Sequence, residues 1–278
     1  MTTDLPKSLT ATFTVAAALL LAALFTSGCG GDSEDSAGPG PEEPAPLLTV
    51  EEALSGEEGT FVRVRGTLFV DEAGVRLCSA VLESYPPQCG GATLELEELD
   101  LDRIVALERP QALEPGGSPG ELPRWTNYEL VVGGTLKEET LRVTEQPPVA
   151  ESRSEGLVLR FAYSPVPLQP GPVSWALDVQ NTGGEARELT FASGQRIEIS
   201  LTPSAGGDPV YRWSEGKMFT QAIETVTIEA GQTWTVTRSD TLPSLEPGSY
   251  TVEAALAADV DLPPARLEAQ TLNDGGSR

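Results

Sequence analysis

The sequence predicts an all-β protein with two folded domains. Short segments in which apolar and polar side chains alternate recur along the chain, and Gly-rich turns separate them. Alternation with a period of two is typical of strands that bury one face. The chain has 278 residues, of which about 250 remain after loss of an N-terminal leader, and that length is typical of two modest domains.

The N-terminus resembles a bacterial lipoprotein signal. Lys7 precedes an apolar run over residues 14–25, small residues follow at 26–28, and Cys29 comes next. The run is too short to be a permanent helix across a hydrocarbon core of about 30 Å. We therefore expect residues 1–28 to be a signal peptide and Cys29 to carry a lipid on the extracytoplasmic face of the cell membrane. Ordinary secretion with an incidental Cys29 is the alternative.

Residues 29–48 predict a disordered tether. Gly, Pro and acidic residues dominate this stretch, and such a composition cannot bury a core. The tether would hold the folded part of the chain away from the membrane.

Residues 49–144 predict a small β-barrel-like domain. Thr49 and Glu52 fit a capping box, which predicts a short helix at the start of the domain. A short barrel of about five strands resembles an OB-like barrel. Because aromatic residues are few and the charge is acidic, a structural spacer fits better than an oligonucleotide-binding module. The expected strands cover 61–70, 75–78, 93–101, 128–136 and 141–143, with a Gly/Pro loop at 110–123.

Cys78 and Cys89 predict one disulfide. They are the two cysteines left when Cys29 goes to lipid, and an exported chain favours their oxidation. On the chain-entropy model, closing a loop of this size stabilises the fold by about 3 kcal/mol. The alternative is a redox or metal pair, which the spacing disfavours because it is not Cys-x-x-Cys and there is no histidine or third cysteine to complete a zinc site.

Residues 157–261 predict an antiparallel β-sandwich, preceded by a linker at 145–156 and followed by a tail at 262–278. Seven or eight short strands with Gly-rich turns are typical of this architecture. Trp175 is expected to anchor the core. The clearest alternating segments are 157–161, 173–179 and 197–201, and strand-like segments continue to residue 256.

Four segments of this second domain resemble the BsuPI family, named for an intracellular proteinase inhibitor. The order and spacing agree over most of residues 157–258, and the pattern Arg212-Trp213-Ser214-x-Gly216-x-x-Phe219-Thr220 is the most specific part. The resemblance implies an immunoglobulin-like sandwich that binds and inhibits a serine proteinase. Because this chain is exported and carries another module, the fold can be retained while the partner differs. The matching segments are 179–183, 189–195, 210–222 and 246–252.

The segment after Trp213 is the expected partner-binding loop, and Lys217 is expected to stay exposed in it. Exposed Met and Phe side chains are strong interface anchors, and an extended loop can enter a proteinase cleft. In the alternative, Trp213 and Phe219 fold back as a hydrophobic plug between the sheets. The loop residues singled out are Ser214, Gly216, Lys217, Met218, Phe219 and Thr220.

Charge and the lack of histidine exclude several functions. The net charge of −24 repels a phosphate backbone, so nucleic acid is not an expected partner, and only a lipid could hold the chain on an anionic membrane. With no histidine, Ser-His-Asp and Cys-His catalysis and imidazole metal sites are excluded. We expect no catalytic residue, no metal and no cofactor. The partner would be a serine proteinase or another envelope protein.

Two alternatives to inhibition remain open. One is a structural or interaction module of the cell envelope without inhibitory activity. The other is a hydrolase with paired carboxylates, which would need two acids in one pocket about 5 to 9 Å apart. The acidic residues are spread over strand-like and loop segments, which is typical of solvated faces.

Overall fold

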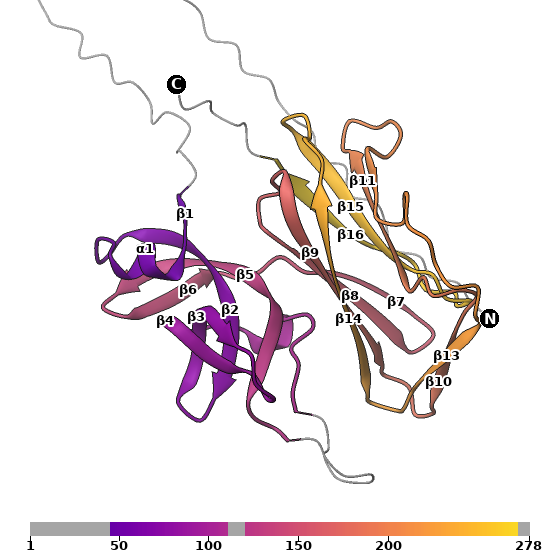
Figure 1. Cartoon of the computed structure of the whole chain (residues 1–278), viewed down its shortest axis with the longest axis horizontal. Coiled ribbons are helices and arrows are strands. Elements are labelled where there is room, and N and C mark those ends of the chain that lie inside the picture. Colours follow the sequence, from indigo (N-terminus) through magenta and orange to yellow (C-terminus); the bar gives the residue numbers. More distant parts are fainter. Residues whose placement is uncertain (1–44, 111–119, 272–278) are drawn as a thin grey trace, which may run out of the picture. The chain divides into compact units, whose positions relative to one another are not determined.

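The structure, a computed structural model, describes residues 45–110 and 120–271, and within them it is all-β as predicted (Figure 1). The described residues belong to one compact unit. The expected signal peptide, Cys29 and the tether as far as residue 44 lie outside them. Among the described residues, no helix is long and apolar enough to cross a membrane.

The first part begins with the short helix that the sequence predicts. Thr49 precedes α1 (Val50–Leu54) and accepts a hydrogen bond on its hydroxyl from the Glu52 N–H, at 3.2 Å. The Glu52 carboxylate accepts one in return from the Thr49 N–H, at 2.8 Å. This reciprocal pair satisfies two backbone donors that the first turn leaves unpaired, and it confirms the capping box.

One sheet forms the rest of this part, and it closes on itself. Its strand order is β1-β2-β3-β4-β6-β5, with β2 also paired to β5. β1 pairs with β2 in parallel, and so does β4 with β6. The other strand pairs are antiparallel. The strands are β1 (Leu47–Leu48), β2 (Phe61–Asp71), β3 (Gly74–Leu82), β4 (Gln88–Glu97), β5 (Arg124–Lys137) and β6 (Thr140–Glu145).

The core of this closed sheet follows the predicted alternation of buried and less buried side chains. Val62 and Val64 are buried, whereas Arg63 between them is half-buried and pairs with Glu145 at 2.9 Å. The strand expected over 93–101 instead starts earlier and ends at Glu97. A 3₁₀ turn follows at Leu101–Arg103, because the Asp100 carboxylate caps it by accepting from the Asp102 N–H at 3.1 Å.

The second part is a sandwich of two four-stranded antiparallel sheets with a small two-stranded sheet, β10-β13 (Figure 1). The orders are β14-β9-β8-β7 and β12-β11-β15-β16. The strands are β7 (Ala150–Ser154), β8 (Leu157–Ser164), β9 (Gly171–Asn181), β10 (Arg187–Phe191), β11 (Ile197–Pro203), β12 (Tyr211–Arg212), β13 (Glu224–Ile228), β14 (Thr233–Leu242), β15 (Ser249–Leu256) and β16 (Ala265–Gln270).

Trp175 lies fully buried in the core that both large sheets share. Its ring centroid is 6.2 Å from that of Phe161 and 5.9 Å from that of Tyr211 on the opposite sheet. Offset aromatic pairs at this separation stabilise a core beyond the area that they bury. The large side chains of the two sheets therefore meet at Trp175.

Three strands lie in segments that the sequence assigned to connections. Leu47–Leu48 falls in the expected tether, Ala150–Ser154 in the expected linker, and Ala265–Gln270 in the expected tail. Each lies at the edge of its sheet. In β7 and β16 exposed positions alternate with buried or half-buried ones, and both residues of β1 are half-buried. Their pairing depends on backbone hydrogen bonds to a neighbouring strand, and such pairing leaves little apolar signal in the sequence.

Strands β8 and β9 are buried on both faces. Their second face carries small side chains, Ala162 and Ala176, which belong to the core cluster of the closed sheet. Beside them lies the buried carboxylate of Asp178, which accepts from the Ala106 N–H at 2.9 Å and from the Thr235 hydroxyl at 2.7 Å. Burial raises the pKa of Asp178 above its ordinary value, although these hydrogen bonds act in the opposite direction.

Candidate functional site

The predicted partner-binding loop lies between β12 and β13. We call residues 213–223 the Met218 loop. It begins with a turn in which the Glu215 N–H donates to the Arg212 carbonyl at 3.2 Å and the Lys217 N–H to the Ser214 carbonyl at 3.1 Å. Gly216 has a φ of 72°, which side chains with a Cβ rarely adopt, so the turn favours glycine there. After the turn, residues 217–223 have no regular secondary structure.

Trp213 and Phe219 form the base of the Met218 loop. Trp213 is buried in the sandwich core, and its backbone N–H donates to the Ile199 carbonyl of β11 at 2.8 Å. Phe219 is half-buried and packs against the Trp213 ring, with a centroid separation of 5.7 Å. The two rings therefore lie together, as in the alternative in which they form a hydrophobic plug, and Phe219 is turned toward the core.

The Lys217 side chain is one-third exposed and is held in place by three contacts. Its Nζ donates to the Trp213 carbonyl and to Asp240 Oδ2, both at 2.6 Å. It also lies 4.8 Å from the centroid of the Trp213 ring, in cation–π range. Lys217 thus lies at the surface, but its ammonium group is bound to Asp240 and to the Trp213 carbonyl.

Asp240, on β14, is the carboxylate that receives these contacts. The Tyr211 hydroxyl donates to the same oxygen at 2.7 Å, and the Thr241 N–H donates to the other at 2.9 Å. Burial alone would raise the pKa of Asp240, but the hydrogen bonds from Lys217, Tyr211 and Thr241 hold it below its ordinary value. Burial and this carboxylate raise the pKa of Tyr211. At neutral pH the cluster is therefore a paired carboxylate and ammonium with a phenol.

Ser214 and Thr220 fasten the rest of the Met218 loop to β11 and to the turn before it. Glu198 accepts from the Ser214 N–H at 3.3 Å and from its hydroxyl. The Thr220 carbonyl accepts from the Gly194 N–H at 2.9 Å. The chain is therefore held to the sandwich on both sides of Met218.

Met218 projects from between these anchors. It is 99% exposed, the highest exposure among the large apolar residues of the described chain. Ile223, at the end of the same loop, is 74% exposed. Of the six residues predicted for this loop, the structure places five against the protein or in the turn and leaves Met218 presented to solvent.

A shallow depression of about 380 Å³ lies beside the Met218 loop. Lys217 and Asp240 form part of its lining, with Glu215 and Leu242. Asp240 and Glu198 could not be predicted from the sequence as partners of the loop. Both lie on other strands, far along the chain, and no local pattern marks them.

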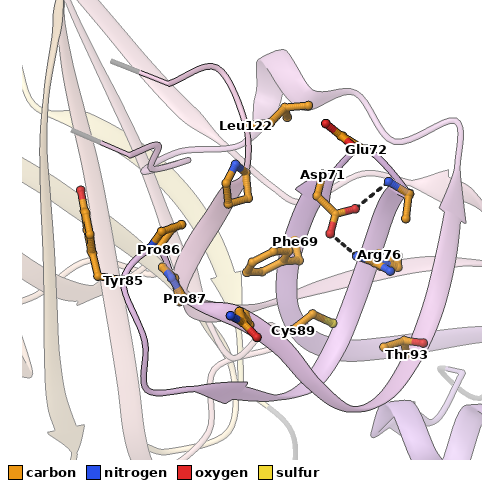
Figure 2. A pocket seen from close by; sticks show the side chains of 13 residues that line it. Phe69, Asp71, Glu72, Arg76, Tyr85, Pro86, Pro87, Cys89, Thr93 and Leu122 are labelled. Atoms are coloured by element: carbon orange, nitrogen blue, oxygen red, sulfur yellow. Dashed lines mark hydrogen bonds and ion pairs between the residues drawn. The ribbon is translucent and has the colours of Figure 1, made fainter. Parts of the chain in front are cut away.

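A larger pocket of about 640 Å³ lies in the closed sheet, and Figure 2 shows its lining. Phe69 lies at its centre, between Pro86 and Pro87 of the β3–β4 connection and the pair formed by Asp71 and Arg76. Asp71 also accepts from the Ala73 N–H at 2.9 Å. This pocket could not be predicted from the sequence, because its lining comes from segments with no shared pattern.

The predicted disulfide joins Cys78 and Cys89, whose Cα atoms are 5.6 Å apart. It links β3 to β4 within one hairpin. The two cysteines are not paired across the hairpin, since Cys78 lies opposite Thr93 and Cys89 opposite Val81. The register shifts between Cys78 and Ala80. The disulfide therefore joins β3 and β4 diagonally across the hairpin.

Glycoside hydrolysis by paired carboxylates requires a general acid whose pKa is raised. The pKa of Asp240 is lowered, and Asp71 is paired with Arg76. Burial raises the pKa of Asp178 and of Glu108, but neither residue lines these two pockets. No group of three potential metal ligands occurs among the described residues.

A match to a known family lies within the sandwich. Residues 164–260 match the BsuPI family, described as an intracellular proteinase inhibitor, which confirms the resemblance predicted from the motifs. The Met218 loop lies wholly within that match. No curated protein matches the chain.

Solved structures of a β-glucosidase from Listeria innocua are similar to part of the chain. A mutant enzyme with laminaribiose is 18% identical, and the complex with isofagomine is 17% identical, each over 60% of this chain and 21% of the enzyme, with a TM-score of 0.25. The similarity therefore spans about a fifth of the enzyme's length. A TM-score of this size supports no argument about fold or activity.

Proposed function

We propose that the protein is an exported lipoprotein whose sandwich domain binds and inhibits a serine proteinase. It acts by binding and not by catalysis. The observation that carries this proposal is the position of the Met218 loop: it lies inside the segment that matches a proteinase inhibitor family, and it presents an apolar side chain between anchored residues. Preorganised loops of this kind lose little conformational entropy when they bind.

Two finer assignments of fold accompany the proposal. The order β2-β3-β4-β6-β5, closed by the pairing of β2 with β5, supports an OB-like barrel. Two antiparallel four-stranded sheets over one core support an immunoglobulin-like sandwich. We infer that the barrel acts as a spacer between the membrane and the inhibitory domain.

The test is inhibition of serine proteinases by the purified full chain. Subtilisin-type, chymotrypsin-type and trypsin-type enzymes are titrated with the chain, and hydrolysis of peptide substrates is followed. We expect at least one enzyme to be inhibited at near-equimolar concentration. Leu82→Ser, which removes an exposed apolar side chain from the barrel, is the matched control and should inhibit equally. Absence of both inhibition and complex formation with all three enzyme types would contradict the proposal.

A second candidate is an interaction module of the cell envelope without inhibitory activity. The barrel pocket favours it, because this pocket lies outside the family match and has exposed Tyr85 and Leu122 at its rim. In that case the full chain would leave all proteinases active. Substitutions in the pocket, and not in the Met218 loop, would then release the partner.

Anchoring through Cys29 is the remaining part of the proposal. The leader of residues 1–28 and the cysteine that follows it support lipidation at this position. The Cys29→Ser variant should move from the membrane fraction to the soluble extracytoplasmic fraction, whereas Cys78→Ser should not. Membrane recovery of Cys29→Ser equal to that of the original chain would contradict lipid anchoring.

A further inference from the structure

We propose that Met218 is the side chain that enters the specificity pocket of the proteinase, and that the target enzyme therefore has an apolar pocket there. This inference rests on the proposed inhibitory function. Serine proteinases select substrates by a pocket that is acidic in trypsin and a hydrophobic slot in chymotrypsin. The identity of the residue that an inhibitor inserts thus determines which enzymes it binds.

The geometry of the Met218 loop supports this role. On one side of Met218, the Lys217 ammonium is held by Asp240 and by the Trp213 carbonyl. On the other side, the Phe219 ring packs on Trp213, and the Thr220 carbonyl accepts from Gly194. The backbone is fixed within two residues of Met218 in both directions, while the side chain itself is 99% exposed.

Lys217 is not available for the same role. To enter an acidic pocket, its ammonium would have to leave Asp240, the Trp213 carbonyl and the face of the Trp213 ring. That movement would leave the partly buried Asp240 carboxylate without its cationic partner, which is unfavourable. The loop therefore offers an apolar and not a cationic residue, and trypsin-type enzymes should be poor targets.

Ile223 is the other large apolar residue of the loop that is exposed, and its setting differs. It directly precedes β13, in which Glu224 pairs with Phe191 on β10. Its branched side chain is stiff, whereas methionine is unbranched and adapts to a narrow apolar pocket. Ile223 therefore serves as a matched control for the effect of exposed apolar area alone.

Substitutions in the full chain test the assignment. Met218→Asp should weaken inhibition of the apolar-pocket enzymes by about 30-fold or more, the loss typical of a central interface residue. Ile223→Asp should change it by less than about 3-fold, which corresponds to a peripheral contact. Met218→Lys should improve inhibition of a trypsin-type enzyme by about 10-fold or more relative to the original chain.

Oxidation gives a second test that leaves the sequence unchanged. Met218 is one of two methionines, and the other is Met1, in the expected signal peptide. Hydrogen peroxide transfers one oxygen atom to the thioether sulfur and is reduced to water, giving a polar sulfoxide. Inhibition should fall after peroxide treatment and return after methionine sulfoxide reductase. Met218→Leu should inhibit as well as the original chain and resist peroxide.

The outcomes separate this inference from the proposed function. If the original chain inhibits a proteinase and Met218→Asp inhibits it equally, the assignment of Met218 is wrong and the inhibitory function stands. The assignment is also wrong if the enzyme cuts the Met218 loop and inhibition disappears as cleavage proceeds, because the loop is then a substrate. If the original chain inhibits no enzyme, the proposed function fails and this inference fails with it.

Discussion

Two loops of the molecule display apolar side chains to solvent, and they are held in different ways. The β3–β4 hairpin presents Leu82 and Tyr85, and a disulfide between Cys78 and Cys89 joins its two strands. The Met218 loop is joined to the sandwich by ring packing and by polar contacts to carboxylates. One loop is fixed by a covalent bond, and the other depends on its surroundings.

This difference predicts how each loop responds to change. The disulfide does not depend on an ionised carboxylate or on a packed core, so it keeps β3 and β4 joined when either is lost. The Met218 loop requires an intact core beneath Trp213 and an ionised Asp240. Substitutions that remove these contacts should therefore weaken the proposed inhibition, whereas substitutions in the hairpin should not.

The largest expected effect comes from removing the base of the Met218 loop. Trp213→Ala deletes a buried ring on which both Phe219 and Lys217 rest, and such a deletion destabilises a protein by about 3 to 5 kcal/mol. Urea unfolding measures the loss. Trp213→Phe, which keeps an aromatic ring, should lose much less. A loss below about 1 kcal/mol for Trp213→Ala would show that the ring contributes little to the core.

Opening the disulfide is the corresponding change in the hairpin. The double variant Cys78→Ala, Cys89→Ala should lose about 3 kcal/mol of unfolding free energy. At a temperature where the variant is folded, it should inhibit proteinases as the original chain does, because the Met218 loop is untouched. Labelling of two reactive thiols at these positions in the native chain would show that the disulfide is not formed in solution.

Much of this architecture could be predicted from the sequence where side chains alternate. The pattern at Val62 and Val64, the capping box at Thr49 and the buried Trp175 all follow from local residue types. The edge strands Ala150–Ser154 and Ala265–Gln270 could not be predicted in this way. Their pairing is made by the backbone, which every residue possesses, so composition does not reveal it.

The candidate site was predictable in position but not in geometry. The motif from Arg212 to Thr220 indicates the loop, yet its letters do not show which side chains turn inward. That outcome depends on Asp240 and Glu198, which are brought to the loop by strand pairing across the sandwich. Long-range pairing of this kind has no local signal, and it decides that Met218 rather than Lys217 is presented.

Removing the charge of Asp240 tests the polar support of the Met218 loop. Because the pKa of Asp240 is lower in the folded chain than in the unfolded chain, its ionised form stabilises the fold above the unfolded pKa. That contribution is lost as the pH falls through the folded pKa. Asp240→Asn should therefore lose about 1 kcal/mol at neutral pH, and the difference from the original chain should shrink in acid.

The control for Asp240→Asn is Glu215→Gln, an exposed acid that lines the same depression. It removes an equal charge without touching Lys217, so its unfolding free energy should match that of the original chain within about 0.5 kcal/mol. Unfolding curves at several pH values compare the two. An equal loss in both variants would mean that net charge, and not the pair with Lys217, is responsible.

The smallest expected effect on stability belongs to Met218, and its neighbour Phe219 provides the comparison. Phe219→Ala removes a half-buried ring from Trp213 and should lose about 1 to 2 kcal/mol. Met218→Ala removes a side chain that solvent already surrounds, so its unfolding free energy should stay within about 0.5 kcal/mol of the original. A residue that leaves stability unchanged yet is needed for inhibition acts at the interface. If Met218→Ala destabilises the chain as much as Phe219→Ala does, Met218 belongs to the plug, and the loop presents no free apolar residue between its anchors.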